Sequence, residues 1–129
     1  MASISNFLEN KILEHTLGVT TYAKPTPYVA LFTTDPTESG TGTEVSTSGT
    51  GYTRIQATFG TASGGSISNS ADITFPVATS SFGTVSHIGI YDAATAGNLL
   101  WHGALTTSKT VQSTDQFKIS TGSLTITLD

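Results

Sequence analysis

The stretch from Ser86 to Leu105 constrains the fold more than any other part of the chain, because it has the pattern of a β-hairpin. Ile88 and Ile90 alternate with His87 and Gly89 in the first arm. In the second arm, Leu99 and Trp101 alternate with Leu100 and His102. A period of two on such residues is typical of strands with one apolar face. The polar segment between the arms is rich in turn formers, so the chain is expected to reverse there.

This hairpin is expected to form the centre of the core, because each large apolar side chain contributes about 1.5–3 kcal/mol when it is buried. A second apolar alternation lies at residues 123–128 and predicts a strand near the middle of a sheet. The predicted core residues are Ile88, Ile90, Leu99, Trp101, Leu124, Ile126 and Leu128.

The hairpin also carries two of the three histidines. If cross-strand partners have residue numbers that add up to about 190, His87 lies opposite Gly103 and His102 lies opposite Ile88. The two imidazoles are then close together but on opposite faces of the sheet. Such a pair cannot converge on one metal ion, so structural roles are predicted for His15, His87 and His102.

Residues Ser3 to Leu17 have the pattern of the one convincing helix. Asn6 and Glu9 have the form of a capping box, and Gly18 follows as a stop signal. Apolar side chains lie on two faces of this helix, and only one face can pack on the chain's own sheet. The second face meets either the following loop or another subunit, and the pattern leaves both possibilities open.

The remaining chain predicts an all-β fold. Short strands are expected at residues 28–33, 52–59, 67–75, 109–111, 116–119 and 123–128, besides the two hairpin arms. About eight short strands after one helix indicate an antiparallel β-sandwich of jelly-roll type. We therefore expect an N-terminal helix in residues 1–18 and a single sandwich domain in residues 19–129.

Residues 34–51 predict a long Ser-, Thr- and Gly-rich loop, in which only Val45 is a candidate for burial. This composition is typical of a flexible surface loop, and the alternative is an arm that becomes ordered against a neighbour. Residues of the helix and loop are thus candidates for an assembly interface. The predicted interface residues are Ile4, Phe7, Leu8, Ile12, Leu13, Leu17 and Val45.

Composition excludes several classes of function. The 129 residues carry a net charge of −4, and the five Lys and Arg residues are scattered, so nucleic acid is not an expected partner. No apolar run approaches the roughly 20 residues of a membrane span, and the N-terminus lacks the pattern of a signal peptide. We expect no membrane partner and synthesis in the cytoplasm of the producing cell.

The sequence also lacks a recognisable catalytic or cofactor site. There is no cysteine, no nucleophile elbow and no phosphate-binding glycine motif. Asp35, Glu38 and Glu44 share one loop, but their spacing matches no calcium loop, and Asp92 is expected to accept hydrogen bonds in a turn. We predict a protein that is not an enzyme and has no metal ion or other cofactor.

Several segments resemble one family of small virion proteins of tailed bacteriophages. These are ADITFPVATSSFGTVSHIGIYDAATAGNLLWHGALTTSKTV at residues 71–111, the ending GSLTITLD, and the earlier ALFTTDPTESGTGTEV and GYTRI. Proteins of this family are labelled as tail fibre or capsid-associated proteins. The resemblance covers nearly the whole chain and implies a location in the virion, after assembly in the bacterial cytoplasm.

Two functions are compatible with this resemblance. The first is a cement or decoration protein that stabilises the head shell, as a homo-oligomer (a trimer) in contact with the major capsid protein or other virion subunits. The alternative is a tail fibre or baseplate component that acts as a receptor- or glycan-binding module. Exposed aromatic side chains would favour the second function.

Overall fold

The fold is an antiparallel β-sandwich with one short helix. Within residues 2–128, which the computed structural model describes, the chain forms the helix α1 and nine strands. Residue 1 of the predicted helical segment 1–18 and residue 129 of the predicted sandwich domain 19–129 lie outside the described residues. The elements in chain order are β1 (Ala2–Ile4), α1 (Asn6–Thr16), β2 (Tyr28–Phe32), β3 (Ile55–Gln56), β4 (Ser66–Ser68), β5 (Ile73–Thr74), β6 (Gly83–Tyr91), β7 (Leu99–Val111), β8 (Lys118–Ile119) and β9 (Thr125–Thr127).

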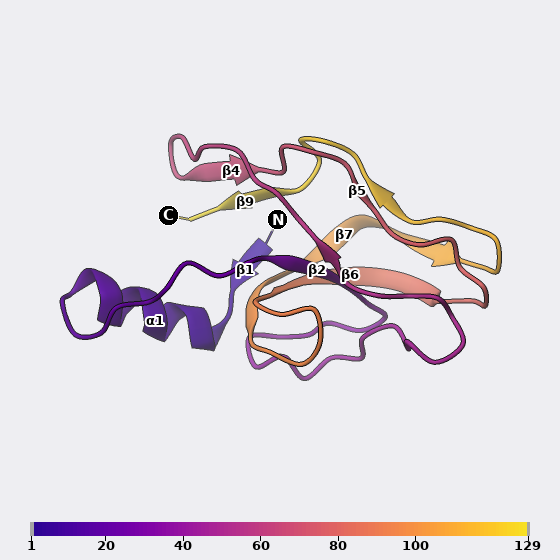
Figure 1. The fold of residues 1–129 in the computed structure, drawn as a ribbon, viewed down its shortest axis with the longest axis horizontal. Coiled ribbons are helices and arrows are strands. Elements are labelled where there is room, and N and C mark those ends of the chain that lie inside the picture. Colours follow the sequence, from indigo (N-terminus) through magenta and orange to yellow (C-terminus); the bar gives the residue numbers. More distant parts are fainter. Residues whose placement is uncertain (1, 129) are drawn as a thin grey trace.

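The strands form two layers. A five-stranded sheet has the order β1-β7-β6-β2-β3, and the pairs β4-β9 and β5-β8 lie over one of its faces (Figure 1). The main core fills the space between the layers, and its most completely buried side chains are Val29, Leu31, Ile73, Phe75 and Val85. The predicted strands at 52–59 and 67–75 are much shorter than expected, because backbone pairing there is confined to β3, β4, β5 and isolated bridges.

The central hairpin is present as β6 and β7, but its register differs by one residue from the prediction. Ile88 pairs with Gly103, and Gly89 pairs with His102. Because His87 is two residues before Gly89, it lies on the same face of the sheet as His102. The prediction that the two imidazoles occupy opposite faces is therefore wrong, since a shift of one residue moves every side chain to the other face.

A bulge near the hairpin turn separates two residues that were expected to share a face. Ile90 pairs with Trp101 whereas Tyr91 pairs with Leu99, so Leu100 is an extra residue in β7. As a result Trp101 packs partly buried against the main core. Leu99 is buried on the opposite face, in a second cluster with Ala30, Phe32 and Tyr91.

The predicted separate strand at 109–111 is the far end of β7. The register passes from His87–Ala104 to Val85–Lys109, so residues 105–108 form a wide bulge. The bulge allows β7 to curve along the edge of the sandwich and remain one strand as far as Val111 (Figure 1).

The end of the chain differs from the prediction of a central strand. β9 pairs only with β4 among the described residues. Leu124 and Ile126 are buried, as are Ile88 and Ile90, but the side chain of Leu128 is 50% exposed. Leu128 was predicted to lie in the core, and this is wrong because it lies beyond β9, where only its backbone N–H is held by the carbonyl of Gly65.

The loop at 34–51 has a structural role that its composition did not indicate. It covers the outer face of the five-stranded sheet: Pro36 is fully buried, and the backbone N–H of Val45 donates to the carbonyl of Leu31. A bridge between Phe32 and Glu44 adds the loop to the edge of β2. The second hydrophobic cluster is therefore covered by this loop.

The helix cap lies at Ser5, one residue before the predicted Asn6, and the residues predicted to form the first turn of the helix belong to a strand. Ile4 belongs to β1, which pairs with β7. Ser5 is the N-cap: its hydroxyl accepts from the N–H of Leu8 at 3.2 Å and donates to the carbonyl of Leu99. Because Ser5 is buried, this cap also fixes the base of α1 to β7.

Candidate functional site

The helix α1 projects from one end of the β-sandwich (Figure 1). The segment after it returns alongside it, and the rings of Phe7 and Tyr22 meet edge to face with centroids 6.3 Å apart. The backbone N–H of Tyr22 donates to Nδ1 of His15 at 3.1 Å. The helix face that carries Phe7 is thus covered by the chain's own residues 19–27.

The end of the helix carries an apolar surface that no described residue covers. Leu13 is 56% exposed, Leu17 is 75% exposed and Val19 is 71% exposed. We refer to these three residues as the helix tip. Apolar groups of this size gain about 1.5–3 kcal/mol each on full burial, so the helix tip is a candidate surface for association.

The predicted interface residues fall into three groups. Leu13 and Leu17 lie in the helix tip, whereas Ile4, Phe7 and Ile12 are half-buried. Leu8 and Val45 are 6% and 4% exposed and pack inside the chain, so their assignment to an interface is wrong. Leu8 is buried because it lies next to the Ser5 cap, and Val45 because the loop follows β2.

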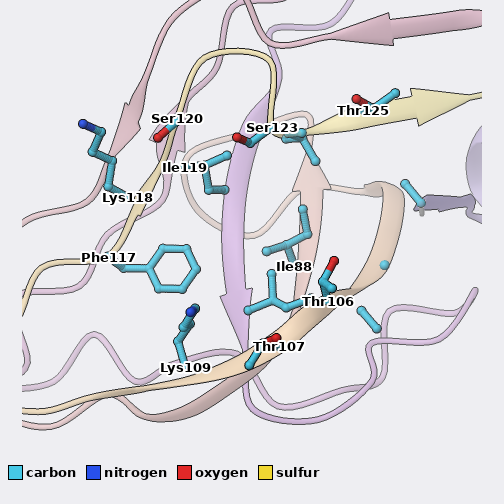
Figure 2. Close-up of a pocket in the computed structure, with 15 residues that line it drawn as sticks. Ile88, Thr106, Thr107, Lys109, Phe117, Lys118, Ile119, Ser120, Ser123 and Thr125 are labelled. Atoms are coloured by element: carbon cyan, nitrogen blue, oxygen red, sulfur yellow. The ribbon is translucent and has the colours of Figure 1, made fainter.

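A second candidate site is a cleft of about 370 Å³ along β7 (Figure 2). It exists because β1 covers only residues 101–103 of β7 and leaves the rest of that edge open. The apolar base includes Ile88, Phe117 and Leu124. The side chains around the opening are hydroxyl groups and two ammonium groups, and we call this site the hydroxyl cleft: Thr106, Thr107, Lys109, Lys118, Ser120, Ser123 and Thr125.

The two lysines of the hydroxyl cleft differ in their surroundings. Nζ of Lys118 lies 3.4 Å from Oδ2 of Asp72. The same carboxylate accepts from the backbone N–H and hydroxyl of Thr121, and these bonds, with Lys118, hold the pKa of Asp72 below its usual range. Lys109 forms no ion pair with any residue between 2 and 128.

The remaining candidate polar residues are dispersed. His102 Nδ1 lies 3.7 Å from Oδ1 of Asp35, and His87 Nδ1 lies 2.8 Å from the hydroxyl of Ser86. Asp92 accepts from the backbone and side-chain amides of Asn98, as expected of a turn residue. Among the described residues, no group of three His, Asp or Glu side chains could hold a metal ion, and no helix is long and apolar enough to cross a membrane.

A polar cluster around Arg54 was not predicted from the sequence. Arg54 donates to both oxygens of Glu44 at 2.9 Å, and to the carbonyls of Ala93 and Ala96 at 3.0 and 2.7 Å. Its guanidinium lies 3.8 Å from the ring centroid of Tyr91. Arg54 thus joins the 34–51 loop to the hairpin loop, and its only signal in the sequence is a lone charge in the otherwise uncharged residues 52–59.

Tyr52 belongs to the same cluster. Its hydroxyl donates to Glu44 at 2.6 Å and accepts from the N–H of Leu31 at 3.1 Å. Burial, together with the hydrogen bond to the Glu44 carboxylate, raises the pKa of Tyr52 far above its usual value. The cluster is internal and holds the loop on the sheet, so we assign it a structural role.

The fold and these surfaces define a small β-sandwich protein with a projecting helical arm. Residues 3–127 match the family described as Podophage GP4 fiber I protein gp80. The chain therefore belongs to this family and is a phage fibre-type structural protein associated with the virion. No curated protein matches the chain. The family confirms the resemblance to tailed-phage virion proteins and favours the fibre alternative over the cement hypothesis.

Proposed function

We propose that the protein is a structural subunit of a podophage tail fibre, and that it joins neighbouring chains through the helix tip. The observation that carries this proposal is the exposure of Leu13, Leu17 and Val19 at the end of a projecting helix. Leu13 and Leu17 are four residues apart and therefore neighbours on the helix surface, and contiguous exposed apolar side chains of this kind mark association surfaces.

The base of the helix supports an assembly role. Ser5 is buried, its N–H donates to the carbonyl of Leu100 at 2.9 Å, and the N–H of Asn6 donates to Glu38 at 3.2 Å. These bonds fix the direction of α1 relative to the sandwich. A fixed direction reduces the entropic cost of association, because the helix tip is positioned before the partner arrives.

Identical subunits are the simplest partners for such a helical arm. In an oligomer with closed cyclic symmetry, the helix tip of every copy would be buried against a neighbour. We propose a homo-oligomer, with a trimer as the expected form, which is incorporated into the virion during assembly in the host cytoplasm. Contact with other virion subunits belongs to the same proposal. The family description supports a fibre location over decoration of the head shell.

Substitution of the helix tip tests this function. The double variant Leu13→Gln/Leu17→Gln should fold but lose oligomers in sedimentation velocity and fail to enter virions. Val77→Gln is the matched control, because Val77 is also an exposed apolar residue, at 50%, but lies between β5 and β6. Unchanged assembly of the double variant would contradict the proposal, and immunogold labelling on the head would favour the cement hypothesis.

A second candidate function, glycan binding by the fibre, is favoured by the hydroxyl cleft. Hydroxyl groups both donate and accept hydrogen bonds, and Lys109 offers an ammonium group that pairs with no acidic residue between 2 and 128, so an acidic saccharide is the best chemical match. Backbone amide spectra titrated with a galacturonate trimer should then change around Lys109, and Lys109→Gln should remove this effect. Lys24→Gln, at an exposed lysine outside the cleft, is the control.

A further inference from the structure

The sandwich has an apolar opening that has no part in the proposed function of the helix tip. This apolar mouth has a volume of about 280 Å³ and lies between the two layers near the start of β2. Every lining residue is aliphatic, aromatic or proline, and the lining includes Pro25, Pro27, Phe59, Ile67, Trp101 and Ile126.

The size and chemistry of the mouth favour side chains as its occupant. Its volume is just below the range of about 300–1,000 Å³ that is typical of small-molecule pockets, and it lacks the convergent polar groups that orient such ligands. Trp101 and Phe59 remain partly exposed in it. Partly exposed aromatic side chains in an apolar recess are the usual anchors of a protein contact.

The chain's own helix does not fill this mouth. No residue of α1 lines it. The helix is held at its base by Ser5 and points away from the sandwich (Figure 1). The chain therefore carries both a protruding apolar surface, the helix tip, and an apolar recess, the mouth. Within one molecule, the helix tip does not line the mouth.

The helix tip and the apolar mouth also have residues of opposite charge beside them. Glu14 lies on α1 between Leu13 and Leu17, and Lys24 directly precedes Pro25 at the mouth. Neither Glu14 nor Lys24 forms an ion pair with residues of the described chain. If Leu13 and Leu17 of one copy enter the mouth of another, opposite charges lie beside the apolar contact and favour this orientation.

We infer that the helix tip of one copy docks into the apolar mouth of a second copy. The inference rests on the proposed role of the helix tip and adds its partner and its receiving site. Because the two contacting surfaces differ, the contact is heterologous, and the rotation between copies decides whether it closes into a ring or continues as a filament.

Cysteine crosslinking tests this arrangement directly, because the chain has no cysteine of its own. Leu17→Cys and Lys24→Cys change two exposed side chains, so both variants should fold. The two full-length variants are co-expressed with different tags, purified together and oxidised. Mixed disulfide dimers between the two tags should form several-fold more than dimers within either tag, because only mixed pairs bring Leu17→Cys of one chain to Lys24→Cys of another.

The control and the alternative outcomes separate this inference from the proposed function. Val77→Cys replaces Lys24→Cys in the control and should give no mixed dimer. Strong crosslinking of Leu17→Cys with itself would show that helix tips meet each other, which overturns docking in the mouth but leaves the assembly role intact. No crosslinking with any partner, combined with unchanged assembly of Leu13→Gln/Leu17→Gln, would overturn both.

Discussion

Removal of the Arg54 guanidinium should destabilise the fold more than any other single charge change. Arg54→Met keeps most of the apolar stem but removes two bonds to Glu44, two bonds to backbone carbonyls and the contact with the Tyr91 ring. The remaining Glu44 carboxylate would be left without its cation in a partly buried position. The loop at 34–51 would lose its main polar link to the hairpin.

The expected loss of stability in Arg54→Met follows from the burial of the Arg54–Glu44 ion pair. The side chains of Arg54 and Glu44 are only 8% and 26% exposed. Breaking a fully buried pair costs about 3–5 kcal/mol, and the partial exposure of Glu44 reduces this to about 2–4 kcal/mol. For a chain of this length, such a loss lowers the melting temperature by about 10 °C.

Urea titration followed by circular dichroism measures the free energy of unfolding of both proteins. Lys118→Met is the matched control, because Lys118 and Asp72 form an ion pair whose side chains are 51% and 48% exposed. Exposed pairs contribute less than about 1 kcal/mol. If Arg54→Met also costs less than about 1 kcal/mol, the cluster does not hold the loop, and the reasoning is refuted.

Two further predictions concern the loop and Tyr52. Gly42→Ala should cost about 1–3 kcal/mol in the same titration, because a Cβ there would lie 2.6 Å from backbone atoms of Asp35 and Pro36. Gly60→Ala, with its nearest neighbour at 3.9 Å, should be almost neutral, and equal effects would contradict an ordered loop. Because the folded state raises the pKa of Tyr52, stability should fall as the pH rises above about 10, and Tyr52→Phe should flatten this decline. Parallel declines in the two proteins would exclude Tyr52 as the cause.

The features that depend on local pattern could be predicted from the amino-acid sequence. Period-two alternation identified the hairpin from Ile88 to Trp101, and the stop signal at Gly18 placed the end of the helix close to where it lies. The two apolar faces of the helix also follow from local pattern, whereas only the structure shows that Leu13 and Leu17 stay exposed. These features require only neighbours within a few residues of each other.

Features that depend on contacts between distant segments became visible only in the folded structure. The bulge at Leu100, which sends Leu99 and Trp101 to opposite faces, is set by the pairing of β7 with β6. The 34–51 loop could be recognised as polar, but its burial of Pro36 requires an open sheet face beneath it. Arg54 finds Glu44 and two carbonyls only after the strands have paired. Residue spacing along the chain does not predict such contacts, because the segments that form them are far apart in the sequence.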